Sequence, residues 1–406
     1  MKRIIIDTQS NRLFRGDEME QDYDQRGGLC QAGENDVVIT TNPINSHYLR
    51  YWKGLGFGLP HLLTAGPFDS RFTLSELIIN NSQLREELKH IVGSSESRLE
   101  FFTIEESERQ LAVELGITPY CNFDVSVPLS RKHSFKIMCQ EIGLPTPTWE
   151  VCSDGTDFLN QGRVFLEKHG HFLLKVDDGT GGISCKGMAK IENEDDLLTV
   201  AKHINSFGSN MVLEKIVQNK AFEVSIHWEV TLDGELKIVD IFGQIADNFA
   251  YVGAFYPAVD EAIEAKIRKQ LMDIFAPFLR SKGALGFYCC DILVSDKGEV
   301  YWIDFNPRKG AIIYVHSMTT RIAKYHGNGR RAHFFHKHNY VPGIGGKDAF
   351  LTIQERLGDL LIPSKQPFVV VTSPGVMEFG YVDITGISQV SIKEAKEVFD
   401  RALRRL

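Results

Sequence analysis

The sequence predicts an α/β protein of several domains. Two observations carry this prediction. Short apolar runs alternate with helical patterns over residues 1–125, and the region that follows adds longer strand-like runs, two of which form a hairpin pattern. At 406 residues and 43% hydrophobic content, the chain can build more than one core. The expected divisions are an N-terminal α/β domain at residues 1–127, a central α+β part with lobes at residues 128–208 and 209–340, and a C-terminal α+β segment at residues 341–406.

The composition excludes several classes of protein. A net charge of −8 argues against a general nucleic-acid binder, which would carry a basic face. No run approaches the roughly 20 apolar residues of a membrane span. The stretch Met1–Asp7 is too short for a signal peptide, and it reaches a charged residue too early. Seven cysteines without paired C-x-x-C clusters indicate reduced thiols. We therefore expect a cytoplasmic protein without nucleic-acid or membrane partners.

The N-terminal region reads as alternating strands and helices. The runs expected to be strands are residues 4–6, 37–40, 61–64 and 101–104. Helices are expected from Ser82 to Ile91 and from Glu105 to Leu115.

A helix with two lysines is expected next. Ser130 can cap a helix from Arg131 to Ile142, whose apolar residues fall on one face, and the stretch from Gly143 to Pro147 ends it. Lys132 and Lys136 lie four residues apart and share a different face.

A buried strand, Phe172–Val176, carries Lys175 near its end and precedes a glycine-rich turn. The glycines of that turn are Gly179, Gly181 and Gly182. Such a turn exposes backbone N–H groups that can wrap phosphate oxygens, and Lys175 can reach the same charge. The alternative is an ordinary hairpin turn, which glycine favours equally.

Two further strands carry acidic residues. Residues 211–214 lead into Lys215–Val217, and Glu223 begins a strand that continues to Trp228. Main-chain groups of a linker can hold adenine, and a carboxylate can hold ribose hydroxyls. Residues 214–217 and Glu223 are therefore candidates for these tasks, or else ordinary acids at strand ends.

A hairpin brings together candidate magnesium ligands. Residues 286–294 and 299–304 read as two strands, and the turn between them has Gly298 where positive φ is expected. Asp291 and Asp304 can then lie side by side, with Asn306 just beyond. Mg²⁺ prefers oxygen ligands, which these residues supply. The alternative is a surface hairpin whose polar residues alternate outward.

The order of these features resembles the ATP-grasp superfamily over roughly residues 128–321. The separations of 11 between Lys132 and Gly143 and of 13 between Asp291 and Asp304 are similar to those of D-alanine–D-alanine ligase-like members. The resemblance implies ATP and two magnesium ions as ligands. It implies phosphate contacts from Lys132 and Lys175, adenine contacts from Glu214 and Ile216, a ribose contact from Glu223, and metal binding by Asp291, Asp304 and Asn306.

The sequence around Arg308 and two departures refine the resemblance. The run Asn306-Pro307-Arg308 resembles the biotin carboxylase and carbamoyl phosphate synthetase branch, where the arginine meets the reacting substrate. Position 304 is aspartate where the family usually has glutamate. Position 289 is cysteine where D-alanine ligases carry a substrate-binding arginine, which puts a D-alanine substrate in doubt.

The flanking regions resemble the pre-ATP-grasp ligases. Residues 36–44 and 379–383 carry this likeness, and the group includes the peptide ligase of pheganomycin biosynthesis and the glutamate–carrier-protein ligase of butirosin biosynthesis. A strand at residues 368–371 and a capping box at Ser391–Glu394 complete the C-terminal segment.

The resemblance implies an ATP-dependent ligase. A carboxylate substrate would be activated as an acyl phosphate with release of ADP, and an amine would then attack while Arg308 and Lys175 stabilise charge. The alternatives are a thiol acceptor on a carrier protein, a carboxylase or kinase, and a non-catalytic nucleotide-binding scaffold. Small-molecule substrates are expected, and oligomerisation is left open.

The basic segment Arg321–Tyr340 contains four histidines. They would suit a metal cluster, but acidic ligands and close Cys/His spacing are missing from the segment. We expect a basic loop that faces a carboxylate substrate or an acidic carrier protein, rather than a merely solvated connector.

Overall fold

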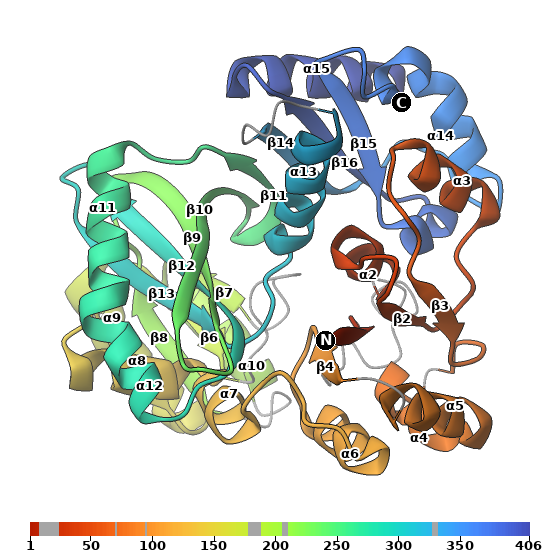
Figure 1. Cartoon of the computed structure of the whole chain (residues 1–406). Coiled ribbons are helices and arrows are strands. Elements are labelled where there is room, and N and C mark those ends of the chain that lie inside the picture. Colours follow the sequence, from red (N-terminus) through yellow and green to blue (C-terminus); the bar gives the residue numbers. More distant parts are fainter. Residues whose placement is uncertain (8–23, 70, 94–95, 178–187, 205–209, 327–331) are drawn as a thin grey trace. The chain divides into compact units, whose positions relative to one another are not determined.

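The computed structural model describes residues 1–7, 24–69, 71–93, 96–177, 188–204, 210–326 and 332–406, and confirms the α/β class (Figure 1). The chain forms two compact units. Unit 1 comprises Met1–Phe123, Val252–Pro257 and Arg308–Leu406, and unit 2 comprises Asp124–Tyr251 and Ala258–Pro307. No helix among the described ranges is both long enough and apolar enough to cross a membrane.

The N-terminal part of unit 1 is a parallel sheet in the order β3-β2-β1-β4. Its strands are β1 (Lys2–Ile6), β2 (Val37–Thr40), β3 (His61–Thr64) and β4 (Ser97–Phe101). The helices of this part are α2 (Asp24–Gln31), α3 (Ser46–Gly54), α4 (Leu74–Asn80), α5 (Ser82–Gly93) and α6 (Glu106–Leu115). Both predicted helices are thus confirmed within two residues.

One predicted strand is misplaced. The strand expected at residues 101–104 is β4, which ends at Phe101. Its first residues are polar, and Arg98 pairs with Glu100 while its guanidinium lies 4.0 Å from the ring centroid of Tyr120. These partners satisfy charged groups inside the sheet, so an apolar run did not mark the strand.

The remaining part of unit 1 is an antiparallel sheet in the order β11-β14-β16-β15. Its strands are β11 (Ala250–Tyr256, from Val252 in unit 1), β14 (His333–Tyr340), β16 (Val382–Ser388) and β15 (Phe368–Thr372). The helical elements are α13 (Ile312–His326), α14 (Ala349–Leu357), η2 (Gly358–Leu361), η3 (Pro374–Phe379) and α15 (Ile392–Arg405). Figure 1 shows α15 lying along this sheet.

Unit 2 contains a small antiparallel sheet in the order β5-β8-β6-β7. Its strands are β5 (Trp149–Cys152), β8 (Met211–Lys215), β6 (Phe172–Val176) and β7 (Met188–Ile191). The helices α9 (Gly155–His169) and α10 (Glu194–Ile204) pack together in this lobe, whose core includes Phe158, Phe172 and Leu197. The predicted strand 172–176 coincides with β6.

The second sheet of unit 2 is antiparallel in the order β13-β12-β9-β10. Its strands are β9 (Lys220–Val230), β10 (Leu236–Asp247), β12 (Gly286–Ser295) and β13 (Val300–Asn306). The helical elements are α7 (Phe123–Leu129, from Asp124 in unit 2), α8 (Lys132–Ile142), α11 (Glu261–Gln270), the π-helix η1 (Leu271–Phe275) and α12 (Ala276–Ser281).

An aromatic core fixes α8 against β13. Phe305 of β13 stacks on Trp228 at 5.9 Å between ring centroids, and Phe135 of α8 lies 5.7 Å from Phe305. Helix α8 ends at Gly143, whose φ of +73° closes the helix with an N–H bond to the Cys139 carbonyl, as predicted. The orientation of α8 is therefore set by burial of its apolar face.

Two predicted caps differ in the structure. Ser130 does not cap α8, because its hydroxyl donates to the carbonyl of Val127, and Arg131 occupies the N-cap position. Ser391 does cap α15 by accepting the N–H of Glu394. The Glu394 carboxylate, however, accepts from the Ser388 hydroxyl, so the expected box is replaced by a wider loop contact.

Candidate functional site

Helix α8 places two lysines in the interior of unit 2. Lys132 and Lys136 are buried and lie one helical turn apart, on a face adjacent to the apolar one. The Lys132 ammonium contacts Asp304 at 3.1 Å, and the Lys136 ammonium contacts Glu214 and donates to the Thr146 hydroxyl. Burial of an ammonium group requires such partners.

Strand β6 brings in a third lysine. Glu214 of β8 lies opposite Leu173, so Lys175, two residues further along β6, is its diagonal neighbour on the same face. The Lys175 ammonium lies 2.7 Å from Glu214 and 3.6 Å from Asp304. Lys175 therefore joins the two carboxylates into one cluster.

The β12–β13 hairpin forms as predicted. Gly298 in its turn has a φ of +73°, and Asp291 pairs directly with Asp304. A register shift follows Asp291, which is half-buried. The amide of Asn306 donates to Asp291 at 3.2 Å, and the amide of Gln244 donates to the other oxygen at 2.7 Å. The three predicted metal ligands thus lie on paired strands, with two of them in direct contact.

The cluster gathers several buried charges of both signs. Its ion pairs join three ammonium groups, Lys132, Lys136 and Lys175, to two carboxylates, Glu214 and Asp304. A third carboxylate, Asp291, pairs with Asp304 across the strands, and its charge also raises the pKa of Lys175. Burial alone would raise the pKa of Asp304, but Lys132, Lys175 and Lys136 lower it below the ordinary value. Burial also opposes ionisation of Glu214, whose pKa is lowered by Lys136 and Lys175. Both carboxylates therefore stay ionised.

The lysines respond differently to this crowding. Burial lowers the pKa of Lys175, but Asp304 and Glu214 outweigh it and raise that pKa above the ordinary value. For Lys136 burial is the largest effect and the neighbouring Lys175 adds to it, so its pKa is lowered despite Glu214. An anion brought near Lys132 and Lys175 would stabilise their charged forms further.

The donor types fit a magnesium–phosphate ligand. Asp291, Asp304 and Asn306 supply carboxylate and amide oxygens, which suit Mg²⁺, and the described residues of this cluster contribute no sulfur ligand or histidine. Lysine ammonium groups beside them suit phosphate oxygens. The cluster can therefore bind a polyphosphate together with a divalent metal.

The contacts described do not connect the other predicted site residues with this cluster. Glu223 lies in β9 and pairs with Lys220. Ile216 follows the end of β8, so it lies in the link between β8 and β9. Arg308 belongs to unit 1, where its guanidinium lies 4.9 Å from the ring centroid of Phe102. Gly179, Gly181 and Gly182 fall outside the described residues.

Sequence reasoning missed three contributors. The sequence places Lys136 on the same face as Lys132 but assigns it no role. For Glu214 it predicts an adenine contact through the backbone and no role for the side chain. Their i, i+4 and diagonal strand relations to Lys132 and Lys175 could have indicated both. Gln244 lies in the middle of a strand 47 residues before Asp291, and nothing local in the sequence points to it.

The prediction of a basic loop at residues 321–340 is wrong for most of that range. Helix α13 continues to His326 and β14 occupies His333–Tyr340, with His336 and His338 buried. The side chains of a strand point alternately to its two sides, so every second residue of β14 faces the interior. This alternation explains why histidine, aromatic and basic residues are interleaved in the segment. Cys289 and Cys290 are buried, as expected for core residues.

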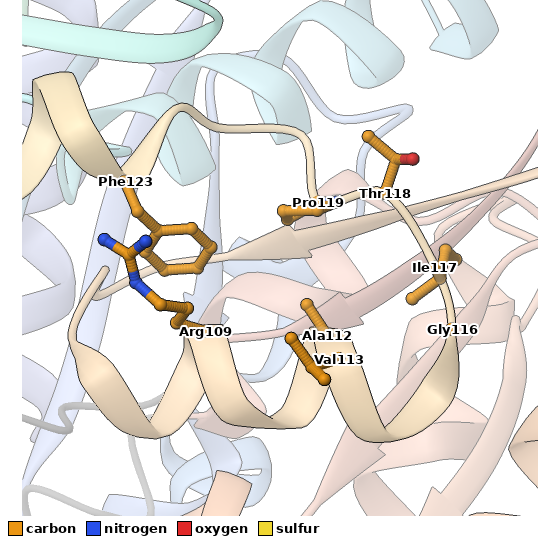
Figure 2. A pocket seen from close by; sticks show the side chains of 8 residues that line it. All are labelled: Arg109, Ala112, Val113, Gly116, Ile117, Thr118, Pro119 and Phe123. Carbon is orange, nitrogen blue, oxygen red and sulfur yellow. The ribbon is translucent and has the colours of Figure 1, made fainter.

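Unit 1 contains a separate open cavity, shown in Figure 2. It has a volume of about 420 Å³ and is lined by α6 and the segment that follows it, from Arg109 to Phe123. The Arg109 guanidinium lies 4.9 Å from the ring centroid of Phe123. None of the predicted site residues lines this cavity.

Comparison with known proteins supports this picture. The model of the pre-ATP-grasp domain matches residues 27–117. D-alanine–D-alanine ligase of Streptococcus pneumoniae (serotype 19F, strain G54) is 22% identical over 216 residues, covering 51% of this chain and 60% of that enzyme. The ligase of the same name from Aeromonas salmonicida (strain A449) is 23% identical over 238 residues, covering 55% and 70%. The match to the pneumococcal enzyme thus spans less than two thirds of its length.

Solved structures show the same fold. N5-carboxyaminoimidazole ribonucleotide synthetase of Thermus thermophilus has a TM-score of 0.60 at 14% identity, covering 100% of this chain and 98% of that one. The biotin carboxylase domain of Hydrogenobacter thermophilus 2-oxoglutarate carboxylase, solved with MgADP and bicarbonate, has a TM-score of 0.55 at 16% identity, covering 84% and 75%. Taken with the match to the pre-ATP-grasp domain at residues 27–117, these likenesses confirm the predicted resemblance to ATP-grasp ligases that carry a pre-ATP-grasp domain.

Proposed function

We propose that this protein is an ATP-dependent ligase that joins a carboxylate to an amine through an acyl phosphate, with release of ADP and phosphate. The observation that carries this proposal is the buried cluster of unit 2, in which three ammonium groups converge on the carboxylates of Glu214 and Asp304. Ammonium groups gathered in this way favour a phosphate substrate. The neighbouring oxygen donors of Asp291 and Asn306 favour a metal beside it.

Each residue has a proposed task. Lys132 and Lys175 bind phosphate oxygens, and Asp291, Asp304 and Asn306 bind two magnesium ions. The link after β8, with the backbone of Glu214 and Ile216, binds adenine, and Glu223 binds ribose. Gly179, Gly181 and Gly182 cover the phosphates. The support for these assignments is the position of each residue in the motif order, and for Lys132, Lys175 and Asp304 also their mutual contacts.

The proposed reaction has two steps. A carboxylate oxygen attacks the γ-phosphorus, the bond to the β–γ bridging oxygen breaks, and ADP leaves. The amine then attacks the acyl carbon, phosphate leaves with its bonding electrons, and the amine loses a proton. Lys132 and Lys175 hold the phosphate oxygens in place and offset their charge during the first step. Magnesium, when bound, would neutralise charge on the terminal phosphates.

Arg308 is proposed to stabilise the negative oxygen formed when the amine attacks. This assignment rests on its position two residues after Asn306. A cysteine at position 289 favours a substrate other than D-alanine, because the arginine of the D-alanine ligases is replaced. An amine rather than a carrier-protein thiol is the proposed acceptor, since the basic segment that favoured a carrier protein is partly a strand with buried histidines.

The reaction class can be tested by trapping the activated acid. Candidate amino acids are incubated singly with Mg-ATP and hydroxylamine, and ADP, AMP and hydroxamate are measured. The expected products with the correct acid are ADP and a hydroxamate, and Arg308→Ala should retain ATP binding but join substrates poorly. AMP with pyrophosphate, or a stable phosphorylated product without coupling, would overturn the ligase. A thioester formed with a carrier protein, but no amide, would replace the amine by a thiol.

A further inference from the structure

Three buried side chains in the antiparallel sheet of unit 1 form a cluster apart from the nucleotide site. His336 and His338 lie in β14 and Asp383 lies in β16, and they are 3%, 5% and 1% exposed. One potential donor atom from each lies within 4.8 Å of the other two. All three belong to unit 1, whereas the proposed magnesium ligands belong to unit 2.

Strand geometry explains why these side chains meet. Residues 336 and 338 alternate along β14 and therefore face the same side of the sheet. His336 pairs with Thr385 and Lys337 with Ile384, but the next pair is Tyr340 with Val382. Two residues, His338 and Asn339, thus oppose the single residue Asp383, which is the arrangement of a β-bulge. The bulge turns His338 toward the Asp383 carboxylate.

The surroundings fix the carboxylate. Asp383 accepts the backbone N–H of Asn339 at 2.8 Å and the hydroxyl of Ser373 at 2.8 Å. Asn339 has a φ of +50°, which asparagine tolerates, and Ser373 has a φ of +60°, which is uncommon for serine. Backbone strain of this kind persists where the surrounding structure requires a particular geometry. Here both left-handed residues donate to the same carboxylate.

The histidines are held as metal ligands usually are. His336 Nδ1 lies 2.9 Å from the Thr385 hydroxyl, so the ring orientation is set by a polar neighbour. His338 Nδ1 lies 3.0 Å from one oxygen of Asp383. Two ligands of one tetrahedral zinc ion lie about 3.3 Å apart, given metal–ligand distances near 2 Å. The present spacing therefore needs only small side-chain movements to enclose an ion.

We propose that His336, His338 and Asp383 bind one divalent transition-metal ion of the zinc class, which ties β14 to β16. Two imidazoles and one carboxylate favour zinc or a similar borderline metal over Mg²⁺ or Ca²⁺. The sequence separates Asp383 from His338 by 45 residues, and the acidic ligand missing from the histidine segment is therefore supplied by the neighbouring strand.

The test uses the full-length protein, prepared without a polyhistidine tag. After chelation and dialysis, Co²⁺ is titrated in the presence of millimolar Mg²⁺, which occupies oxygen-rich sites. The expected result is saturation at one Co²⁺ per chain with visible absorption bands of a low-symmetry site, and displacement of Co²⁺ by one equivalent of Zn²⁺. Zinc should also raise the thermal unfolding midpoint of the chelated protein.

Matched variants assign the ligands. His336→Ala, His338→Gln and Asp383→Asn should each lose saturable binding, whereas His333→Ala should bind like the unmodified protein, because His333 lies on the same strand with the opposite parity. Failure of the unmodified protein to bind Co²⁺ or Zn²⁺ with a defined stoichiometry would overturn the proposal, whether or not the variants fold. Equal loss in His333→Ala would do the same. Mg-ATP binding is measured in parallel, so that failure of the nucleotide site is recognised separately.

Discussion

Both units bury lysine ammonium groups, but the two clusters differ in how many they gather and in the oxygen donors beside them. In unit 1, a single ammonium group, that of Lys309, contacts Asp7 at 3.2 Å and Glu100 at 3.1 Å, and Glu100 also pairs with Arg98. In unit 2, three ammonium groups converge on Glu214 and Asp304, and Asp304 pairs across the strands with a third carboxylate, Asp291.

The difference indicates what each cluster is for. A lysine enclosed by carboxylates satisfies its own charge and stabilises the fold only while every partner remains. Several ammonium groups beside paired carboxylates and an amide oxygen can also bind a phosphate together with a divalent metal. Buried lysines alone therefore do not mark a site, whereas their convergence on metal-binding oxygens does.

The largest expected effect is on stability in unit 1. Glu100→Gln removes one of the two buried carboxylate partners of Lys309 and the partner of Arg98, whose charges lower the pKa of Glu100 against the effect of burial. Removing one partner of a buried ion pair typically costs about 3 to 5 kcal/mol of unfolding free energy. Because Asp7 still contacts Lys309, we expect the lower end of that range. Chemical denaturation would measure this, and Mg-ATP affinity should be unchanged. A stable Glu100→Gln protein that no longer binds Mg-ATP would break the comparison.

The matching change in unit 2 is Asp304→Asn, which also neutralises a buried carboxylate. Because Asp304 is a proposed metal ligand, we expect Mg²⁺-dependent ATP affinity to fall roughly 100-fold, which is about 2.7 kcal/mol. Calorimetric titration of Mg-ATP checks this. If Asp304→Asn lost only stability, like Glu100→Gln, both clusters would be structural.

The positive charge of the unit 2 cluster can be reduced directly. Lys175→Met removes one ammonium group but keeps an apolar stem, and a charge-assisted bond to phosphate contributes about 1.5 to 3 kcal/mol, or roughly 10- to 150-fold in affinity. The control is Lys190→Met in β7, since Lys190 is exposed and pairs only locally with Glu192. Equal ATP dissociation constants for the two variants would remove Lys175 from the site.

The smallest expected effect concerns the interior of unit 1, where burial lowers the pKa of His316 to about 4. An unfolded histidine titrates near 6.5, so below that pH the unfolded chain binds the extra proton first. The free energy of unfolding should therefore be unaffected by His316 above pH 6.5. Between pH 6.5 and 4 it should fall by about 1 to 2 kcal/mol, after allowing for partial exposure. His316→Gln should flatten that part of the stability profile. The same change at the exposed His90 should leave it intact.

The sequence predicted the local parts of the fold well. The hairpin with Asp291 opposite Asp304, strand β6 with Lys175, and helix α8 with Lys132 all follow from periodicity and turn residues. The misplaced β4 shows the limit of that reasoning, because Arg98 and Glu100 sit in a strand through partners distant in the sequence.

Site residues could be predicted only where the order of the motifs identifies them. Gln244 reaches Asp291 because β10 and β12 both flank β9, and sheet order is not written in any local pattern. Asp383 reaches His338 for the same reason, through pairing of β14 with β16. Long-range pairing depends on the total packing of the chain, so single-residue patterns cannot reveal it.

The composition of unit 1 from three separate segments has a consequence during protein synthesis. Tyr48 in α3 donates its hydroxyl to the carbonyl of Val371, 323 residues later. At typical ribosome speeds of about 5 to 20 residues per second, the early segment waits roughly 15 to 65 seconds for this partner. The residues of the lysine cluster, from Lys132 to Asp304, all emerge during that interval. Unit 2 is therefore complete on the ribosome before unit 1, and the early segment of unit 1 must wait for its C-terminal partners.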